Sequence, residues 1–377
     1  MCESIWEMHL DERGGAGYLY LNLTLNSFVM NKVEGLLTVT DLIENNTLSS
    51  EMAALDWHCV EKRIPMLVGG GVGTGRTTTL NYLANFIKPD ARVVSIEDYY
   101  KLSDDMPPEY RVDAMQRPKL SLYHKNWSPM RVPISWKGGY AEECGPSSSD
   151  LLREAIGQRP DYIIVDDLRG DEAYSLFRAM ATNGCTSLAT IHTPDVSETF
   201  KMLLSEEGMH IPRTLIPNPG VIKIQGLKRI EEFKLRAEEK LQQYKTEEER
   251  QQNWEQTMKE LYPEPRIAEE PIRTLSTTEI IGLDQFTNEI FHNNLYSYNA
   301  EKDAYLFSGR SYLLEKLAIE SGMSPKEVHE QVDMKKTVLE WMVESGIRNY
   351  PDVVDVIQKF YSNPEEVFNK AKETSLL

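Results

Sequence analysis

The chain has 377 residues, 41% hydrophobic and 27% charged, which is enough for two or three domains with a sizeable buried core. Its 59 acidic residues outnumber 41 basic ones and give a net charge of −18, which argues against bulk binding to nucleic acid or to an anionic bilayer surface. There is no apolar run long enough to span a membrane, no signal-peptide pattern and no C-x-x-C pair among the four cysteines, which fits the reducing cytoplasm.

The first predicted elements precede a glycine-rich loop. Alternating apolar residues predict a strand over residues 18–25. Capping signals at Thr40 or Asp41, and again within residues 47–50, predict the starts of two helices.

The chain is organised around LVGGGVGTGRTTTLNYL, residues 67–83, where a short apolar run enters a glycine-rich turn ahead of a predicted helix. Gly70, Gly75 and Thr77 have the spacing of a phosphate-binding loop, G-x-x-x-x-G-K-[ST]. Glycines let backbone N–H groups curl around phosphate oxygens, and the helix start points its positive end at them. We predict that Thr77 binds Mg²⁺ and that ATP is bound by Gly70, Gly71, Val72, Gly73, Thr74, Gly75, Arg76, Thr77 and Thr78.

Arg76 stands where this motif has a lysine. An arginine keeps the positive charge, but its planar fork is longer than the compact lysine ammonium and fits differently between phosphates. An ordinary glycine-rich turn would also explain the loop. The succession of strand, loop and helix favours a phosphate site.

Two predicted strands after the loop end in pairs of acids. Residues 91–98 end in Glu97 and Asp98, which could face a ligand at the sheet edge, although taken alone this pair is better explained by a polar strand end entering a loop. Residues 162–165 end in Asp166 and Asp167. In phosphate-loop enzymes one such acid orders Mg²⁺ and the next polarises the attacking water.

Two more stretches complete this half of the chain. Residues 103–149 have no clear periodicity, which is typical of a functional loop or an insertion. A strand over residues 186–192 ends at His192, which can sense a γ-phosphate, although a hydrogen bond to the backbone explains it equally well. Alternating strands and helices predict an α/β fold with a mostly parallel sheet covered on both faces. The loop, Glu97, Asp166, Asp167 and His192 would then meet at one crevice.

The remaining residues are first charged and helical, and then form a hairpin and a helical tail. Apolar residues at steps of three and four form a narrow seam, which a long solvated helix explains better than a coiled coil: Ile230, Phe233, Ala237, Leu241 and Tyr244. We therefore expect five segments, namely a remnant of an N-terminal domain with a linker (1–35), a nucleotide-binding core (36–227), a charged helical insertion (228–271), a β-hairpin region (272–310) and a C-terminal helical region (311–377).

These segments occur in the order of a known family. From about residue 36 the chain resembles the secretion ATPases of type II and type IV systems, most closely the archaeal branch that powers archaella and type IV pili. The similar segments are the phosphate loop, VVSIED, RPDYIIVDDLRGDEAYSLFRAMATNG, TIHTPD, EIIGLDQFTNEIF and VLEWMVESGIRNY. The resemblance implies a RecA-like P-loop NTPase core in a hexameric ring. ATP turnover there moves domains against a polytopic membrane platform protein.

The chain departs from the family at several points. Arg76 replaces the loop lysine, Lys101 replaces a further glutamate, and Asp166–Asp167 replaces glycine–glutamate. Asp167 therefore stands at the catalytic glutamate with one methylene less, and a misplacement of ~1 Å can cost ~100-fold in rate. The family's N-terminal domain, which lends arginines to the nucleotide, is represented only by residues 18–25. Residues 228–271 are an addition.

Two hypotheses follow. In the first, the chain is a cytoplasmic motor ATPase, docked on the membrane platform, for an archaellum, a type IV pilus or a type II-like secretion apparatus. Thr77 and Asp166 then order Mg²⁺, Asp167 positions the water, Glu97 assists and His192 senses the γ-phosphate. In the second, it is an impaired regulatory or structural subunit that joins a full-length paralogous ATPase. A DNA-processing ring ATPase fits the core but not the acidic balance.

Overall fold

The computed structural model describes residues 37–71, 73–100, 126–137, 140–143, 145–182, 184–206, 208–218, 220–241, 253–254, 257, 271–284 and 286–375. The predicted strand at 18–25, Val72 of the phosphate loop, Lys101 and Tyr244 lie outside these residues.

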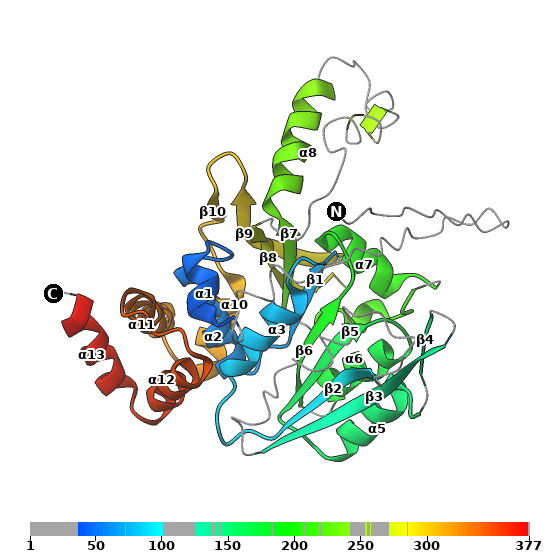
Figure 1. The fold of residues 1–377 in the computed structure, drawn as a ribbon, viewed down its shortest axis with the longest axis horizontal. Coiled ribbons are helices and arrows are strands. Elements are labelled where there is room, and N and C mark those ends of the chain that lie inside the picture. Colours follow the sequence, from blue (N-terminus) through cyan, green and yellow to red (C-terminus); the bar gives the residue numbers. More distant parts are fainter. Residues whose placement is uncertain are drawn as a thin grey trace, which may run out of the picture.

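One sheet organises the described chain (Figure 1), with the strand order β10-β9-β8-β7-β1-β6-β5-β2-β3-β4. Its centre is parallel and consists of β7 (Val221–Leu227), β1 (Met66–Gly70), β6 (Thr186–Ile191), β5 (Tyr162–Leu168), β2 (Val93–Tyr100) and β3 (Trp127–Lys137). Both edges are antiparallel, with β4 (Tyr140–Glu143) on one side and β8 (Ile272–Leu283), β9 (Ile290–Asn299) and β10 (Ala304–Phe307) on the other.

Helices cover both faces of the sheet (Figure 1). One face carries α1 (Val39–Glu44), α2 (Ser50–Glu61), α3 (Arg76–Asn85), α10 (Tyr312–Ser321), α11 (Pro325–Glu344), α12 (Tyr350–Ser362) and α13 (Pro364–Ser375). The other carries α5 (Ser148–Gly157), α6 (Glu172–Thr182) and α7 (Val196–Leu204). Alternate strand residues supply the two cores, since Val68 and Ile164 face the first layer and Leu67 and Ile163 the second. The predicted mostly parallel α/β sheet, covered on both faces, is confirmed.

The predicted helix starts agree with the structure to within two residues. α1 follows Thr38, which forms a capping box with Asp41, so the helix begins slightly before the predicted start. α2 follows Ser49, whose hydroxyl accepts the N–H of Met52 at 3.2 Å. The expected hairpin is present as β8 and β9. The division into five segments stays a prediction.

Two predictions about the middle of the chain are wrong. Residues 127–137 and 140–143, predicted to be irregular, form β3 and β4. Pro129 and Pro133 obscure the strand pattern. Among the described residues, β4 pairs with residues 134–137 of β3, so both prolines lie where β3 pairs with β2 but not with β4. A missing N–H costs little at such an edge. β2 also continues to Tyr100, so Glu97 lies inside this strand rather than at its end.

The C-terminal helices complete the first core. The buried Trp57 of α2 stacks on Phe86 with ring centroids 5.2 Å apart, and its centroid lies 4.8 Å from that of Phe360 on α12. Its Nε1 donates to the hydroxyl of Tyr361 at 2.9 Å, and this hydroxyl donates to the Phe86 carbonyl at 2.5 Å. Residues far apart in the chain therefore share one aromatic cluster.

Two buried charge clusters tie α2 to its neighbours. Lys223 of β7 lies 2.6 Å from Asp56, which also accepts the hydroxyl of Tyr82 at 2.7 Å. Closer to the end of α2, Lys335 of α11 lies 2.9 Å from Glu61, and its Nζ is 3.4 Å from Nδ1 of His58. Burial, reinforced by Lys335, lowers the pKa of His58 from 6.5 to about 3. The imidazole is therefore neutral in the folded chain.

The predicted insertion begins and ends on adjacent strands. α8 (Lys228–Leu241) starts directly after β7 and projects away from the sheet (Figure 1). The N–H of Lys228 donates to the carbonyl of Pro271 at 2.9 Å. Asp303 binds Lys228 at 2.7 Å and Arg273 at 2.8 Å. The base of the segment 228–271 is thus closed by backbone and ionic contacts. Ala237 and Leu241 of the predicted seam are buried.

Candidate functional site

The glycine-rich loop joins the end of β1 to the start of α3. Gly73 has a φ of 73° and Gly75 a φ of 82°, in the left-handed region that glycine adopts without strain. The hydroxyl of Thr74 donates to the carbonyl of Gly71 at 2.9 Å and closes the turn. The loop therefore brings the N-terminus of α3, with its unpaired N–H groups, to the carboxyl end of the sheet.

Gly70 permits close backbone contact at the base of this loop. A Cβ atom at Gly70 would overlap the hydroxyl of Thr74 and lie 2.9 Å from the carbonyl oxygen of Gln225 and 3.1 Å from Cγ of Arg76. No side chain fits without displacing the loop. This compact cradle is what backbone N–H groups need to surround a phosphate.

A hydroxyl–carboxylate network lies at the mouth of the loop. The Thr77 hydroxyl is 3.1 and 3.2 Å from the two oxygens of Asp166, two residues before the end of β5. Thr190 of β6, the strand between β1 and β5, donates its hydroxyl to Asp166 at 2.7 Å. Three elements therefore hold the two predicted Mg²⁺-binding side chains together.

Asp167 lies beside this network. Its N–H donates to the hydroxyl of Thr190 at 2.7 Å, and its carboxylate accepts Nε of Arg169 at 2.8 Å. Nη1 of Arg76 lies 3.6 Å from its Oδ1. Burial lowers the pKa of Arg76, while the Asp167 and Asp166 carboxylates oppose this shift.

Glu97 and His192 lie at the margin of the site. Glu97 accepts the hydroxyl of Ser95 at 2.8 Å, and the last pair between β2 and β5 is Ile96 with Val165, one residue before Glu97 and Asp166. His192 is exposed just after β6. Partial burial and the charge of Arg76 lower the pKa of His192. The side chain of Asp98 lies outside the described part of the structure.

The site thus joins most of the predicted residues. Thr77, Asp166, Asp167 and Arg76 share direct contacts, whereas Glu97 and His192 contact other groups. Sequence reasoning missed Thr190 and Arg169. Each lies two residues from a predicted site residue, but neither pair lies within one strand, because β5 ends at Leu168 and β6 at Ile191. The sequence therefore carried no strand pattern that could have found Thr190 or Arg169.

The residues present fit a phosphate group with Mg²⁺. Nη1 of Arg76 and Oδ1 of Asp167 are buried without a hydrogen-bond partner, and a phosphate oxygen would satisfy the arginine. Thr77 and Asp166 provide the hard oxygen ligands that Mg²⁺ prefers alongside nucleotide phosphates. Within the described ranges, no group of three or more His, Cys, Asp or Glu side chains could hold a metal ion unaided.

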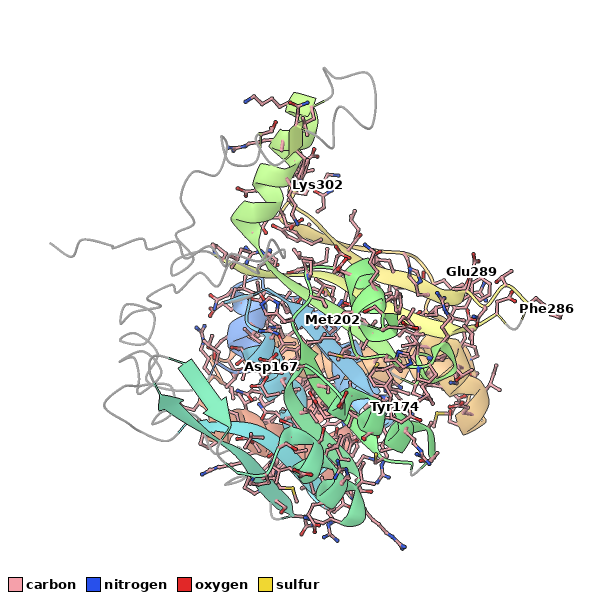
Figure 2. All side chains as sticks on the ribbon, turned by 90° about the vertical axis from the view of Figure 1, so that its right-hand side faces the viewer. Asp167, Tyr174, Met202, Phe286, Glu289 and Lys302 are labelled. Atoms are coloured by element: carbon pink, nitrogen blue, oxygen red, sulfur yellow. The ribbon has the colours of Figure 1, made fainter. Side chains whose placement is uncertain are left out.

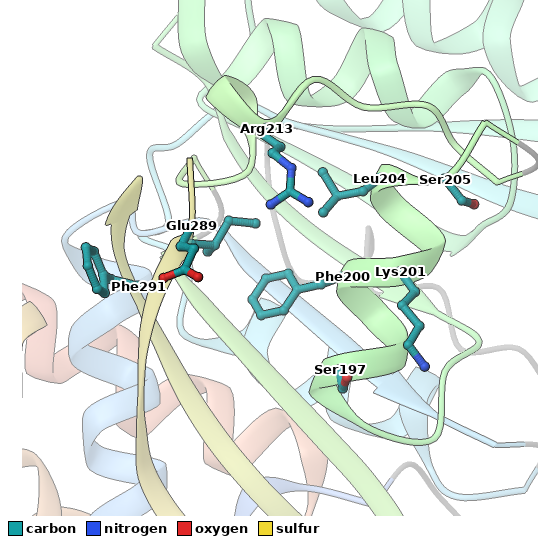
Figure 3. A pocket seen from close by; sticks show the side chains of 9 residues that line it. Ser197, Phe200, Lys201, Leu204, Ser205, Arg213, Glu289 and Phe291 are labelled. Carbon is teal, nitrogen blue, oxygen red and sulfur yellow. The ribbon is translucent and has the colours of Figure 1, made fainter. Parts of the chain in front are cut away.

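A cavity of about 580 Å³ lies elsewhere (Figure 3). Phe200 of α7 faces Glu289 across it, and its other lining residues are Ser197, Lys201, Leu204, Ser205, Arg213, Ile290 and Phe291. None of these is a predicted site residue. Phe286 lies at the tip of the β8–β9 hairpin, which borders this cavity. Figure 2 shows Phe286 far from Asp167. The chemistry of the phosphate loop therefore carries the functional argument.

The fold and the loop define an α/β protein of the phosphate-loop class. A family model described as "Type II/IV secretion system protein" matches residues 26–216, just over half of the chain. The chain belongs to this family. Its membership and the sheet confirm the predicted RecA-like α/β fold class.

Three relatives illustrate the similarity. The uncharacterized protein MJ1287 of Methanocaldococcus jannaschii is 32% identical over 290 residues, 77% of this chain and 85% of that protein. The uncharacterized protein MJ0900 of the same organism is 27% identical over 345 residues, 89% of this chain and 51% of that protein. Protein VirB11 of Agrobacterium fabrum is 31% identical over 157 residues, 42% of this chain and 39% of that protein. The chain therefore spans about half or less of the last two.

Two solved structures are similar in part. The VirB11 ATPase of the Brucella suis type IV secretion system, in complex with sulphate, is 19% identical, with 55% of this chain and 53% of that chain covered and a TM-score of 0.34. The pilus retraction motor PilT with bound ADP is 20% identical, with 54% and 62% covered and a TM-score of 0.31. Among the described residues of the present chain, no helix has the length and apolar character to cross a membrane.

Proposed function

We propose that the chain binds Mg-ATP and hydrolyses it to power a type II/IV-class machine such as an archaellum, a type IV pilus or a secretion apparatus. The observation that carries this proposal is the contact of Thr77 with Asp166 at 3.1 Å, beside a glycine cradle at the N-terminus of a helix. Family membership supports the reaction class. Thr77 and Asp166 would hold Mg²⁺, which supplies charge neutralisation on the phosphates when it is bound.

The chain's own residues have separate tasks in this mechanism. The loop N–H groups and Arg76 bind the phosphates and stabilise the charge that develops on them. Thr190 orients Asp166 through its 2.7 Å hydrogen bond. Asp167 accepts a hydrogen bond from the attacking water, whose oxygen bonds to the γ-phosphorus as the bond from phosphorus to ADP breaks, and the proton of the water passes to the released phosphate. Glu97 and His192 act from the margin, Glu97 on the water network and His192 as a sensor of phosphate charge.

The proposal extends to the assembly. By analogy with the family, we propose a homo-oligomeric ring, with six copies as the first arrangement to test. This ring would dock at the cytoplasmic side of a polytopic membrane platform protein. The net charge of −18 argues against nucleic acid as the partner.

The test is Mg-ATP hydrolysis by the native chain beside an Arg76→Lys/Asp167→Glu double variant, at concentrations where oligomers form. Comparable turnover supports the motor proposal. Turnover by the double variant alone would show that the native residues reduce catalysis. Absence of nucleotide binding by both the native chain and the double variant would reject the motor proposal.

A second candidate is a regulatory subunit with weak turnover. The specific observation in its favour is that Asp167 is already engaged by Arg169 and by Arg76, which leaves less of its carboxylate for a water. If this function holds, the chain alone will hydrolyse ATP slowly and will change the rate of a full-length paralogue on mixing. No change of that rate at saturating chain concentration would reject the candidate.

A further inference from the structure

Asp167 has a backbone conformation that fixes its position. Its φ is 64°, in the left-handed region where Asp is one of the better tolerated residue types. The pairing of β5 with β6 shifts register between Val165 and Leu168, and Thr190 accepts the N–H of Asp167. The backbone is therefore held, and the carboxylate is the part of Asp167 that can exchange partners.

Two arginines from different elements reach this carboxylate, and we call Arg76, Asp167 and Arg169 the arginine clamp. Arg169 follows the same strand and donates Nε to Oδ2 at 2.8 Å, and its Nη2 reaches the same oxygen. Arg76 begins α3 and brings Nη1 to 3.6 Å from Oδ1. Asp167 thus lies between the phosphate loop and an arginine of its own strand end.

The two arms of the arginine clamp differ in quality. The side chain of Arg169 is exposed, and it forms a hydrogen-bonded ion pair with Asp167. The Arg76 arm is longer than a hydrogen bond, and both of its facing atoms are buried without a hydrogen-bond partner. A buried charged atom without a hydrogen-bond partner costs free energy. A better acceptor for Arg76 therefore breaks its contact with Asp167 before the contact of Arg169 breaks. Phosphate oxygens at the loop are such an acceptor.

We propose that the arginine clamp is a switch: Asp167 holds Arg76 in the nucleotide-free chain, a nucleoside triphosphate draws Arg76 away, and Arg169 alone then positions Asp167 at the strand end. This inference rests on the proposed function, because it requires the loop to bind nucleotide. It makes Arg169 a positioning residue, and it makes Asp167 a competitor of the phosphates for Arg76.

The first test measures affinity for the Mg²⁺ complex of AMP-PNP, an ATP analogue that is not hydrolysed. Asp167→Asn keeps the side-chain size and removes the competitor, so binding tightens about two- to fivefold, the equivalent of one weak ion pair. Removing a carboxylate also lowers general repulsion of phosphate. The same change is therefore made in an Arg76→Ala chain, where the gain specific to the clamp disappears. Equal tightening in both backgrounds overturns the proposal.

Arg169 has its own test. Arg169→Ala leaves Asp167 with Arg76 alone, which weakens AMP-PNP binding about two- to fivefold, the equivalent of part of an exposed ion pair. Arg178→Ala removes an exposed arginine on α6 and serves as the matched control. Unchanged affinity in Arg169→Ala, or an equal loss in the control, excludes Arg169 from the switch.

A measurement without nucleotide separates this inference from the proposed function. In the nucleotide-free chain, Arg76→Ala and Asp167→Asn will shift the melting temperature non-additively, by about 1–3 °C. Additive shifts overturn the clamp itself. Coupled shifts support the clamp. If AMP-PNP does not bind in the same preparation, this missing binding rejects both the transfer of Arg76 to phosphate and the nucleotide site.

Discussion

Thr77 and Asp166 show how single atoms define the site. Each would be an ordinary polar residue alone, but the hydroxyl of Thr77 lies 3.1 Å from a carboxylate that Thr190 also orients. A hydroxyl and a carboxylate held at one point provide two oxygen ligands beside the phosphate cradle. The hydroxyl of Thr77 is therefore the atom to remove first.

We expect Thr77→Val, which keeps the branched shape and loses the hydroxyl, to bind Mg-ATP about tenfold more weakly, the cost of ~1.4 kcal/mol for one charge-assisted contact. Affinity for ATP without Mg²⁺ should change much less. Titration calorimetry with and without Mg²⁺ measures both values. Thr77→Ser is the control and should bind like the native chain. Equal Mg-ATP affinity in Thr77→Val would contradict the assignment.

At this scale the sequence predicted the residues that obey a spacing rule. The phosphate loop and the acid pair, whose roles stay predictions, follow motifs whose geometry depends on local chain contacts, so Thr77 and Asp166 were singled out. Arg169 was not, because its role depends on the register shift after Val165, which turns the Asp167 carboxylate toward it. Such a shift has no pattern in the sequence.

At the scale of elements, α2 connects the sheet to the C-terminal helices. One side of this helix holds Trp57 against α12, and another brings His58 and Glu61 to Lys335 of α11. Capping signals predicted the start of α2, and the C-terminal residues were predicted to be helical. The pairing between α2 and α11–α12 joins distant residues, such as Trp57 and Tyr361, which are 304 positions apart. It rests on side-chain fit, which a local sequence pattern does not encode.

We expect Tyr361→Phe to lower the free energy of unfolding by about 1–3 kcal/mol, because it leaves the Trp57 N–H and the Phe86 carbonyl without their partner. Urea denaturation measures the change. Tyr174→Phe on α6 removes an exposed hydroxyl and should have little effect. A loss no greater than that of Tyr174→Phe would show that water replaces the missing hydroxyl.

The neutral His58 predicts a pH dependence. Its pKa is about 3 in the folded chain and 6.5 in the unfolded chain, so the unfolded state binds the proton first as the pH falls. This contribution to stability is complete above pH 6.5 and is lost progressively from pH 6.5 toward 3. Between pH 7.5 and 5.5 the loss is about 1.4 kcal/mol.

Urea denaturation at these two pH values tests the His58 prediction. His58→Gln removes the titrating group while Glu61 and Lys335 remain, so its stability should change less over this interval. Equal slopes for the native chain and the variant would mean that another group controls the pH dependence.

At the scale of the whole molecule, the sheet continues from the phosphate loop into the hairpin region. β7 pairs with β1 on one side and with β8 on the other. Ile272, the first residue of β8, would lie 3.1 Å from a Cβ atom at Gly75. The sequence predicted the insertion and the hairpin separately. It did not predict that they meet beside the loop, because this depends on the order of strands in the sheet.

We expect that replacing residues 229–270 by an Asn-Gly turn will leave the fold and the AMP-PNP affinity within about threefold of native. The ends of the segment are already hydrogen-bonded, and a two-residue turn joins such strands with less loss of chain entropy. Circular dichroism and calorimetry measure both properties. Asp303→Ala in the shortened chain removes the ionic contacts and should lower its melting temperature. Failure of the shortened chain to fold would show that the segment belongs to the core.

The closed base of segment 228–271 has a consequence for how such a chain can diversify. Length and composition can change beyond Lys228 and Pro271 while the strand register and the loop next to Gly75 stay the same. The segment is thus a position where a lineage can acquire a new attachment without changing the sheet or the glycine-rich loop. Ile272, which follows the segment, lies next to Gly75, so any attachment acquired there is joined to the chain beside the loop.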